Sequence, residues 1–394
     1  MMFDFIVAGS GAGGATAAKE LSCGGKKVLL LEKGKPVQQG AASKAYEIIP
    51  AEVEIWQAVC LGGTTGVTMG NAVRSPLNTK LDPYFAEAEE EMDAWTVPLS
   101  KMGPATRLLL DLSKDWIPMP KAIDHNACRS CGVCSFGCPS GAKWDATAYV
   151  RDAVSHGCTV ATNTLVKRVM IEQKRAVGVE TADGRVFKGK AVILAAGAIE
   201  TPRILMRSGF EFVGQGLFVD TFITVGGVKR GVGLSKELNM ALYMKGDGYL
   251  LFPHYSSLIL PEITKKGIEA KATDILGLMV KISDEPAGEV KHTSVVKGLT
   301  AGDAELLDRG RKEAMDLLLR AGVEEATIVE TRLRGAHPGG TCSGVVRSPV
   351  KPWTEVDSLY ISDASVIPGP FGLPPMLTIV AISKLLSSKL LGRA

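Results

Sequence analysis

The sequence predicts an α/β fold, α+β overall, in which a doubly wound, Rossmann-like domain is joined by a second domain with an antiparallel sheet. Three observations lead to this fold class. The chain opens with a buried strand, a glycine-rich loop and a helix, residues 159–187 alternate apolar and polar side chains, and residues 222–296 contain further strand-like runs. With 394 residues, 46% of them hydrophobic, the chain is long enough to bury a large core or two interlocked ones.

The individual elements follow from local patterns. Strands are expected at residues 3–8 and 27–31, with a helix over 15–22 between them, which together form a β-α-β unit. Further helices are expected at residues 84–93, 303–320 and 376–391. A turn at residues 182–184 separates short antiparallel strands.

Composition excludes several classes of protein. Lys and Arg total 45 against 42 Asp and Glu, and these charges are scattered, so no basic surface indicates a nucleic-acid partner. The longest apolar run, residues 371–386, is interrupted by two prolines and a lysine, so we expect no membrane span. The apolar start of the chain lacks a basic region ahead of it, which favours a cytoplasmic protein over a secreted one. A small-molecule substrate is therefore expected.

A glycine-rich loop follows the first strand directly. Gly9, Gly11 and Gly14 form the pattern GxGxxG, and Ala12 and Gly13 complete the loop. The first glycine permits the turn, the second lets the backbone approach a pyrophosphate, and the third lets helix and strand pack closely. The anion then lies at a helix N-terminus.

An acidic residue ends the second strand. Glu32, followed by Lys33, lies 18 residues after Gly14, close to the spacing of about 20 at which a carboxylate accepts a hydrogen bond from a ribose hydroxyl. An acid here disfavours a 2′-phosphate. The combination predicts a dinucleotide site without deciding which dinucleotide.

Four of the eight cysteines fall within eleven residues. Cys128, Cys131, Cys134 and Cys138 have the spacing C-x2-C-x2-C-x3-C and are followed by a proline, as in bacterial ferredoxins. A 4Fe-4S cluster closed by Cys138 is the preferred interpretation. A ligand from Cys158 or another distant cysteine, a 3Fe-4S cluster, a structural zinc ion and free thiols remain alternatives.

Four segments, in order along the chain, resemble the signatures of the glucose-methanol-choline (GMC) flavin oxidoreductases. They are residues 62–74 (GGTTGVTMGNAVR), residues 197–209 (GAIETPRIL ending in SG), residues 337–341 (HPGGT), and residues 362–365 (SDAS) followed by 374–378 (PPMLT). The resemblance implies FAD, with its pyrophosphate at Gly11 to Gly14 and its ribose on Glu32. Val166 would meet the adenine, and Asp363 and Ala364 the ribityl chain. The other cofactor contacts expected from the resemblance are Gly62, Gly63, Thr64, Gly70, Asn71, Ala196, Gly197, Pro375 and Met376.

The same resemblance identifies His337 as the catalytic acid/base, a task that suits an imidazole. Family members that oxidise alcohols usually carry a second His or Asn where this chain has Pro374, so simple alcohol oxidase activity is less expected. The helix starting near Pro375 would direct its N-terminus at the flavin. Five residues of the second domain are candidates for a substrate pocket: Tyr243, Tyr249, Phe252, His254 and Tyr255.

Together these observations predict an FAD- and iron-sulfur-containing oxidoreductase, a dehydrogenase or reductase and not an oxidase. It would move hydride between a CH–OH or related substrate and FAD, and exchange electrons with a ferredoxin-like carrier or partner subunit. A ferredoxin-driven reductase of a C=C or C=O bond and an electron-transfer subunit are the alternatives. The expected domains are 1–74, 159–216 and 335–394 for FAD, 75–158 as a connecting segment with the cysteines, and 217–334 for substrate.

Overall fold

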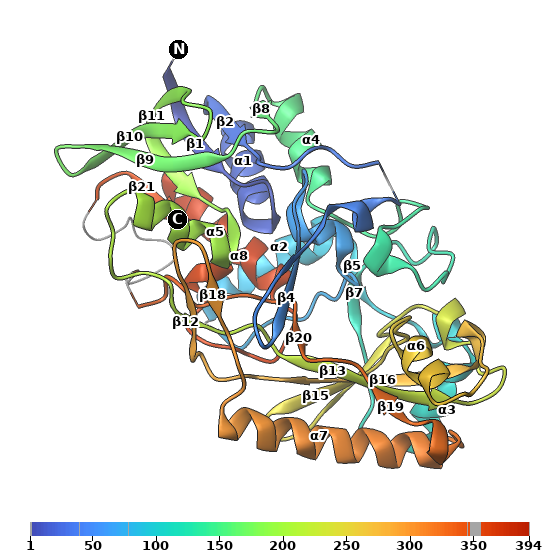
Figure 1. Cartoon of the computed structure of the whole chain (residues 1–394). Helices are drawn as coiled ribbons and strands as arrows, with labels where there is room; N and C mark the ends of the chain where they lie inside the picture. The colour runs from blue at the N-terminus through green and yellow to red at the C-terminus, as the bar shows by residue number, and fades with distance from the viewer. Residues whose placement is uncertain (1, 39, 78, 345, 347–355, 394) are drawn as a thin grey trace.

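A computed structural model describes residues 2–38, 40–77, 79–344, 346 and 356–393 (Figure 1). Residues 347–355 of the expected third FAD segment therefore lie outside the described residues. The elements form two main sheets, one near the N-terminus and one above the long helix α7, Ala301–Arg320 (Figure 1).

The first sheet has seven strands in the order β8-β2-β1-β11-β10-β9, with β21 added beside β11. Strand β1 pairs in parallel with β2 and β11, while β9, β10 and β11 form antiparallel hairpins. Strand β8 pairs in parallel with β2, so it belongs to the doubly wound core and not to the antiparallel strands that follow it. The bounds are β1 Met2–Ala8, β2 Val28–Leu31, β8 Thr159–Ala161, β9 Val166–Glu172, β10 Arg175–Thr181, β11 Val186–Leu194 and β21 Leu359–Ile361.

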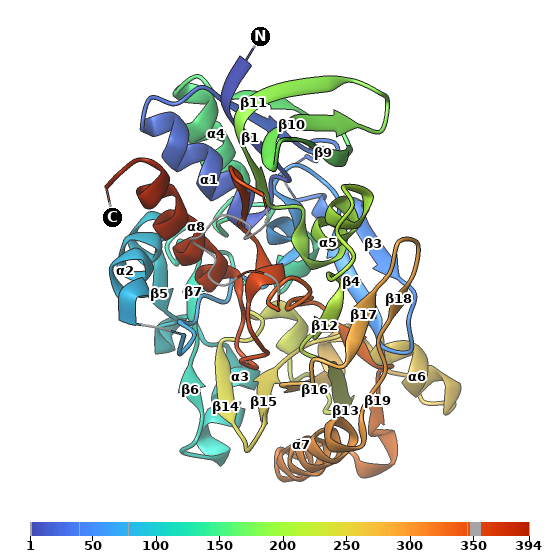
Figure 2. The same ribbon diagram turned by 90° about the vertical axis from the view of Figure 1, so that its left-hand side faces the viewer.

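Helices cover both faces of this sheet. Because neighbouring side chains of a strand point to opposite faces, Phe5 and Val7 pack with α1, α4 and α8, whereas Ile6 and Ala8 pack with α5. Figure 2 shows α1, α4 and α8 grouped apart from α5. The bounds are α1 Ala12–Cys23, α2 Asp82–Glu91, α4 Thr147–Ser155, α5 Gly197–Arg207 and α8 Met376–Leu390. The doubly wound α/β fold predicted from sequence is confirmed.

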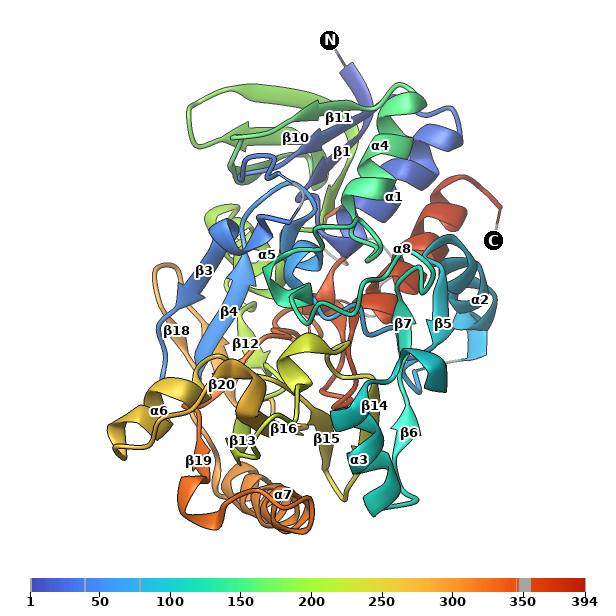
Figure 3. The same cartoon turned by 90° about the vertical axis from the view of Figure 1, so that its right-hand side faces the viewer.

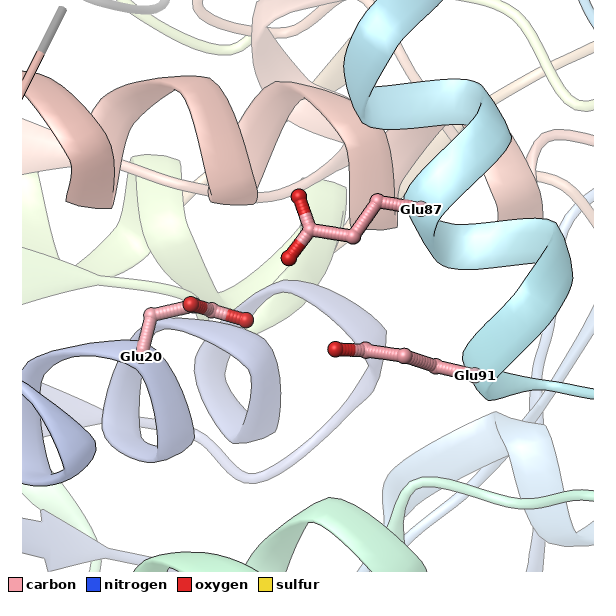
Figure 4. A group of neighbouring side chains, drawn as sticks. All are labelled: Glu20, Glu87 and Glu91. Atoms are coloured by element: carbon pink, nitrogen blue, oxygen red, sulfur yellow. The ribbon is translucent and has the colours of Figure 1, made fainter.

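A buried lysine joins three of these helices. The side chain of Lys384 on α8 places its Nζ 2.7 Å from Glu20 on α1, and 2.8 Å and 3.0 Å from Glu87 and Glu91 on α2. Figure 4 shows the three carboxylates pointing toward one another. Their convergence resembles a cation site, but the ammonium of Lys384 already occupies that role.

The second sheet has nine strands in the order β3-β4-β20-β13-β16-β15-β14-β6, with β19 paired to β13. All of its strand pairs are antiparallel except β4 with β20. Helix α7 packs along one face, against β13, β15 and β16. The bounds are β3 Tyr46–Ile49, β4 Glu54–Ala58, β6 Ile117–Pro118, β13 Phe222–Val228, β14 Leu242–Lys245, β15 Tyr249–Pro253, β16 Ile275–Ile282, β19 Val329–Glu330 and β20 Arg334–Gly335.

Strands β3 and β4 come from residues 46–58, so the segment 1–74 contributes to both sheets. The smaller elements connect or flank the sheets. They are β5 Ala94–Thr96, α3 Pro104–Leu112, β7 Pro120–Ala122, β12 Gln215–Leu217, α6 Ile259–Lys265, β17 Gly288–Val290 and β18 Val295–Val296. Figure 3 shows the loop between β7 and α4, which carries the four cysteines, lying between the two sheets. Among the residues that the structure describes, no helix combines the length and apolar character needed to cross a bilayer.

Candidate active site

A cavity of about 610 Å³ opens where the carboxyl ends of the parallel strands face the second sheet. This edge of a doubly wound sheet is where ligands bind in open α/β folds. The cavity brings together most of the residues singled out in the sequence. They are Gly9, Gly11, Ala12, Gly13, Glu32, Lys33, Gly63, Thr64, Asn71, Val166, Ala196, Gly197, His337, Asp363, Ala364, Pro375 and Met376.

The glycine loop is tightly packed on one side and open on the other. A Cβ at Gly14 would lie 1.9 Å from the carbonyl oxygen of Gly9, and one at Gly13 would lie 1.7 Å from that of Ser362. A Cβ at Gly11, the N-cap of α1, would meet no protein atom within 4 Å. The open side faces the cavity at the start of a helix, which is the arrangement that accepts a pyrophosphate.

Glu32 is buried and holds the glycine loop in place. Its carboxylate accepts hydrogen bonds from the Ser10 amide at 3.0 Å, the Ser10 hydroxyl at 2.7 Å and the Gly34 amide at 2.7 Å. Two carboxylate oxygens offer about four lone-pair sites, so one remains for a ribose hydroxyl. The neighbouring Lys33 forms an ion pair with Glu47 at 3.6 Å.

The segment 62–71 lies directly against the glycine loop. Gly62 has φ +89° and donates its amide hydrogen to the Ser10 hydroxyl at 3.0 Å, and a Cβ at Gly63 would lie 3.0 Å from the Cα of Gly11. Gly70 also has positive φ, at +73°. Gly14, Gly62 and Gly70 do not line the cavity themselves but set the backbone conformation of the loops whose neighbouring residues do.

Asp363 lines the cavity and joins two of its loops. Its carboxylate accepts from the Gly197 amide at 2.9 Å, the Thr201 hydroxyl at 2.6 Å and the Ser365 amide at 2.8 Å. Burial raises the pKa of Asp363. The carboxylate thereby fixes the turn after β11 against the turn after β21.

His337 lines the same cavity and is oriented by a carboxylate. Its Nδ1 lies 2.9 Å from Oδ2 of Asp220, and the same oxygen lies 3.2 Å from Nζ of Lys281. The side chains of Asp220 and Lys281 are each 3% exposed. Asp220 is held at φ +50°, a conformation uncommon outside glycine.

The electrostatics of this group favour a neutral imidazole. Burial lowers the pKa of His337, and the charge of Lys281 lowers it further. Burial alone would raise the pKa of Asp220, but Lys281 and His337 together hold it below its ordinary value. With Nδ1 donating to an ionised carboxylate, Nε2 is left to accept a proton.

Asp220 and Lys281 were not recognised from the sequence. The available signal was weak: a charged residue inside the apolar run of β16, and another just before β13. Residues 220, 281 and 337 are far apart along the chain, and only the pairing of β13 with β16 brings the first two together.

The expected substrate-pocket residues divide into two groups. Phe252, His254 and Tyr255 line the cavity, and burial lowers the pKa of His254 to about 4. Tyr243 packs in the buried cluster beside Phe252, whereas the hydroxyl of Tyr249 donates to Glu313 on α7. The cavity wall also includes Pro374, just before the start of α8.

The cysteine loop reaches the same cavity. Cys134 is buried and Cys128, Cys131 and Cys138 are half-buried, while Gly132, Ser135 and Phe136 line the cavity wall. No three of the four sulfur atoms gather within 4.8 Å among the described residues. A tetrahedral zinc ion with Zn–S bonds of about 2.3 Å would require closer sulfur atoms.

Hydrogen bonds to the sulfur of Cys138 favour its thiolate form. Its Sγ accepts from the Lys143 amide at 3.4 Å and lies 3.5 Å from the Ser140 hydroxyl. Burial alone would raise the pKa of Cys138, but these hydrogen bonds lower it. The thiolate form is the one that binds metal.

Comparisons with known proteins agree with this geometry. The GMC oxidoreductase family matches residues 77–221 with its N-terminal part and residues 272–383 with its C-terminal part. An uncharacterised protein of Methanocaldococcus jannaschii is 34% identical over 97% of this chain and 98% of its own length. The long-chain-alcohol oxidase FAO3 of Arabidopsis thaliana is 22% identical over 98% of this chain and 67% of its own.

Among solved structures, pyridoxine 4-oxidase from Mesorbium loti superposes with a TM-score of 0.75 at 15% identity, covering 98% of this chain and 99% of that one. This likeness shows the shared fold. The glycine loop, open toward the cavity at Gly11, and the small residues of segment 62–71 fit the FAD that this family uses. The chain belongs to the GMC oxidoreductase family of FAD-dependent enzymes.

Proposed function

We propose that the chain moves hydride between a CH–OH or related substrate and FAD, and passes electrons to or from an iron-sulfur cluster and a protein carrier. One observation carries the proposal: a single cavity is lined by the glycine loop, by His337 and by the loop that holds the four cysteines. This shared lining supports a site in which a dinucleotide, a proton acceptor and the cysteine loop would surround one volume.

The FAD contacts follow from the cavity lining. Gly11 to Gly13 would receive the pyrophosphate at the start of α1, and Glu32 the ribose. Val166 would meet the adenine, and Asp363 with Ala364 the ribityl chain. FAD, when bound, supplies the hydride chemistry at the flavin ring.

His337 would handle the substrate proton. As the alcohol carbon gives up its hydrogen as hydride to FAD, the hydroxyl proton of the alcohol would pass to Nε2 of His337, which leaves a carbonyl product. Asp220 is a positioning residue that keeps the Nδ1 hydrogen on the far side of the ring and balances the imidazolium that forms. Lys281 keeps Asp220 ionised.

An alcohol-like substrate is supported by the names of the alcohol oxidase and pyridoxine oxidase relatives. Pro374 contributes no polar side chain to the cavity wall, so the substrate oxygen would take its hydrogen bonds from other groups that line it. Lys281 and Thr224 line that wall.

The cysteines favour a dehydrogenase or reductase over an oxidase. An iron-sulfur cluster on Cys128, Cys131, Cys134 and Cys138, when bound, would carry single electrons to or from a ferredoxin-like protein. The reverse direction, reduction of a C=C or C=O bond, uses the same residues, and the absence of a polar side chain at Pro374 favours it mildly.

The test of this function uses the reduced holoenzyme. We expect slow reaction with O2 and fast reaction with a ferredoxin or a one-electron dye. Rapid formation of peroxide in a 1:1 ratio with flavin would show an oxidase instead. Substitution His337→Asn distinguishes an enzyme from an electron-transfer subunit, because the subunit would keep its carrier-to-dye activity while the enzyme loses substrate-dependent flavin reduction. Exposed His156→Asn is the matched control.

A further inference from the structure

Two buried lysines flank the cysteine loop. Lys121, on β7, is fully buried, and Lys143 is 4% exposed. Burying an ammonium group is costly unless an opposite charge or a full set of hydrogen bonds compensates it. Neither lysine takes part in the proton chemistry proposed above, so their burial calls for another explanation.

Lys121 connects the cysteine loop to residues 62–71, the segment that lies against the glycine loop and that we call the flavin loop. Its Nζ donates to the carbonyl oxygen of Met69 at 2.8 Å and to Oδ1 of Asn71 at 2.6 Å. Both acceptors are uncharged. The ammonium is therefore hydrogen-bonded without being neutralised.

Lys143 also connects the cysteine loop to the flavin loop, at residues that precede those bound by Lys121. Its Nζ donates to the carbonyl oxygens of Thr65, Gly66 and Thr68 at 3.0, 2.9 and 2.9 Å. Its amide hydrogen, by contrast, points to the sulfur of Cys138. One residue thus touches the flavin loop with its side chain and a cysteine with its backbone.

No carboxylate forms an ion pair with either lysine among the residues that the structure describes. The other deeply buried lysines differ in this respect, since Lys281, Lys297 and Lys384 each lie 2.7 to 3.2 Å from a carboxylate oxygen.

Negative charge on the cysteines would offset the cost of burying these two lysines. Burial lowers the pKa of Lys121 to about 8, and Cys134 and Cys128 act in the opposite direction. Burial likewise lowers the pKa of Lys143, and the charges of Cys134, Asp145 and Cys138 would raise it.

We propose that Lys121 and Lys143 are the counter-charges of an anionic iron-sulfur cluster on the four cysteines and tie that cluster to the flavin loop. The inference rests on the proposed function, because it requires the cluster. A cluster held by four thiolates carries net negative charge, which supplies the anion that both lysines lack. Their hydrogen bonds to the flavin loop would fix the cysteine segment relative to the FAD cavity.

The proposal predicts a direction for the reduction potential. Reduction adds negative charge to the cluster, and two nearby buried cations stabilise the reduced form. Removing either cation should therefore lower the midpoint potential of the cluster.

The test uses Lys121→Gln and Lys143→Gln, which retain a hydrogen-bond donor but lose the charge. Exposed Lys114→Gln, from the same segment, is the control for net charge. Purified holoproteins are analysed for iron, sulfide and FAD, and the cluster is titrated with dithionite under EPR detection. We expect each buried variant to lose iron or to shift the one-electron equilibrium at least tenfold toward the oxidised form, about 59 mV. The control should match wild type.

Unchanged iron content and midpoint potential in both glutamine variants would overturn the proposal. If the glutamine variants do not fold, Lys143→Arg keeps the charge and should retain iron and FAD, with a midpoint potential within about 59 mV of wild type, which is a tenfold change in the one-electron equilibrium. A midpoint potential lowered by more than about 59 mV in this variant would overturn the role of charge. Wild-type protein without iron and sulfide would instead refute the proposed function, independently of the lysine variants.

Discussion

Substitution Gly11→Ala separates cofactor binding from folding more cleanly than any other change in the glycine loop. The new Cβ would meet no protein atom within 4 Å, and Gly11 has φ −65°, which any residue adopts. Replacing an N-cap glycine by alanine costs about 1 kcal/mol of helix stability or less. If the pyrophosphate approaches the backbone here, the same methyl group should weaken FAD binding at least tenfold, or about 1.4 kcal/mol.

Gly14→Ala is the matched contrast within the same loop. Its Cβ would lie 1.9 Å from the Gly9 carbonyl oxygen, so α1 must shift against β1. Overpacking of this kind costs about 1–3 kcal/mol or more. We expect this variant to unfold at lower temperature even without FAD, because the clash lies within the protein itself.

The assay compares apoproteins first and cofactor binding second. Thermal unfolding of flavin-free protein should give nearly equal midpoints for wild type and Gly11→Ala, and a lower one for Gly14→Ala. Titration with FAD, followed by quenching of flavin fluorescence, then gives the Kd of each folded form. Wild-type affinity in Gly11→Ala would refute the placement of the pyrophosphate at this loop.

Three further predictions concern the proton acceptor and the helix-joining lysine. Asp220→Asn should present an amide to His337 Nδ1 and slow flavin reduction by an alcohol substrate about 10²–10⁴-fold in stopped-flow kinetics, with FAD content unchanged; a wild-type rate would contradict the positioning role. Lys384→Met should lower the free energy of unfolding by about 2 kcal/mol in urea titrations, a value between the cost of breaking an exposed ion pair and that of breaking a buried one. The exposed control Lys389→Met should leave the free energy of unfolding unchanged. Burial alone would raise the pKa of Glu91, but its hydrogen bonds and the charge of Lys384 lower it. The stability that ionised Glu91 adds to the folded state should therefore be complete above pH 4.5 and decline as the pH falls toward the folded-state pKa. A Lys384→Met variant should show a smaller loss of stability over that acidic range than wild type, and an equal loss would contradict this assignment.

The local parts of the fold could be predicted because their signals are local. A strand, a glycine loop and a helix in succession determine the β-α-β unit, and the observed α1, Ala12–Cys23, begins within the predicted loop. The helices α7 and α8 start within two residues of the expected positions, since apolar periodicity marks both.

Non-local pairing explains what the sequence did not reveal. Strands β4 and β20 pair although about 280 positions separate Glu54 from its partner Arg334, and no periodicity encodes that partnership. The same limit applies to the site. Sheet register brings Asp220 and Lys281 to His337. The role of Lys121 and Lys143 becomes apparent only from their hydrogen bonds to carbonyl groups of the flavin loop.

The measurement that tests the central claim most directly is an absorption spectrum of anaerobically purified protein, with iron, sulfide and zinc determined on the same sample. We predict flavin bands with a broad shoulder that bleaches on addition of dithionite, and about four irons per chain, as one 4Fe-4S cluster requires. Flavin alone, with zinc or with no metal, would contradict the two-cofactor account and make O2 or a quinone the expected electron acceptor.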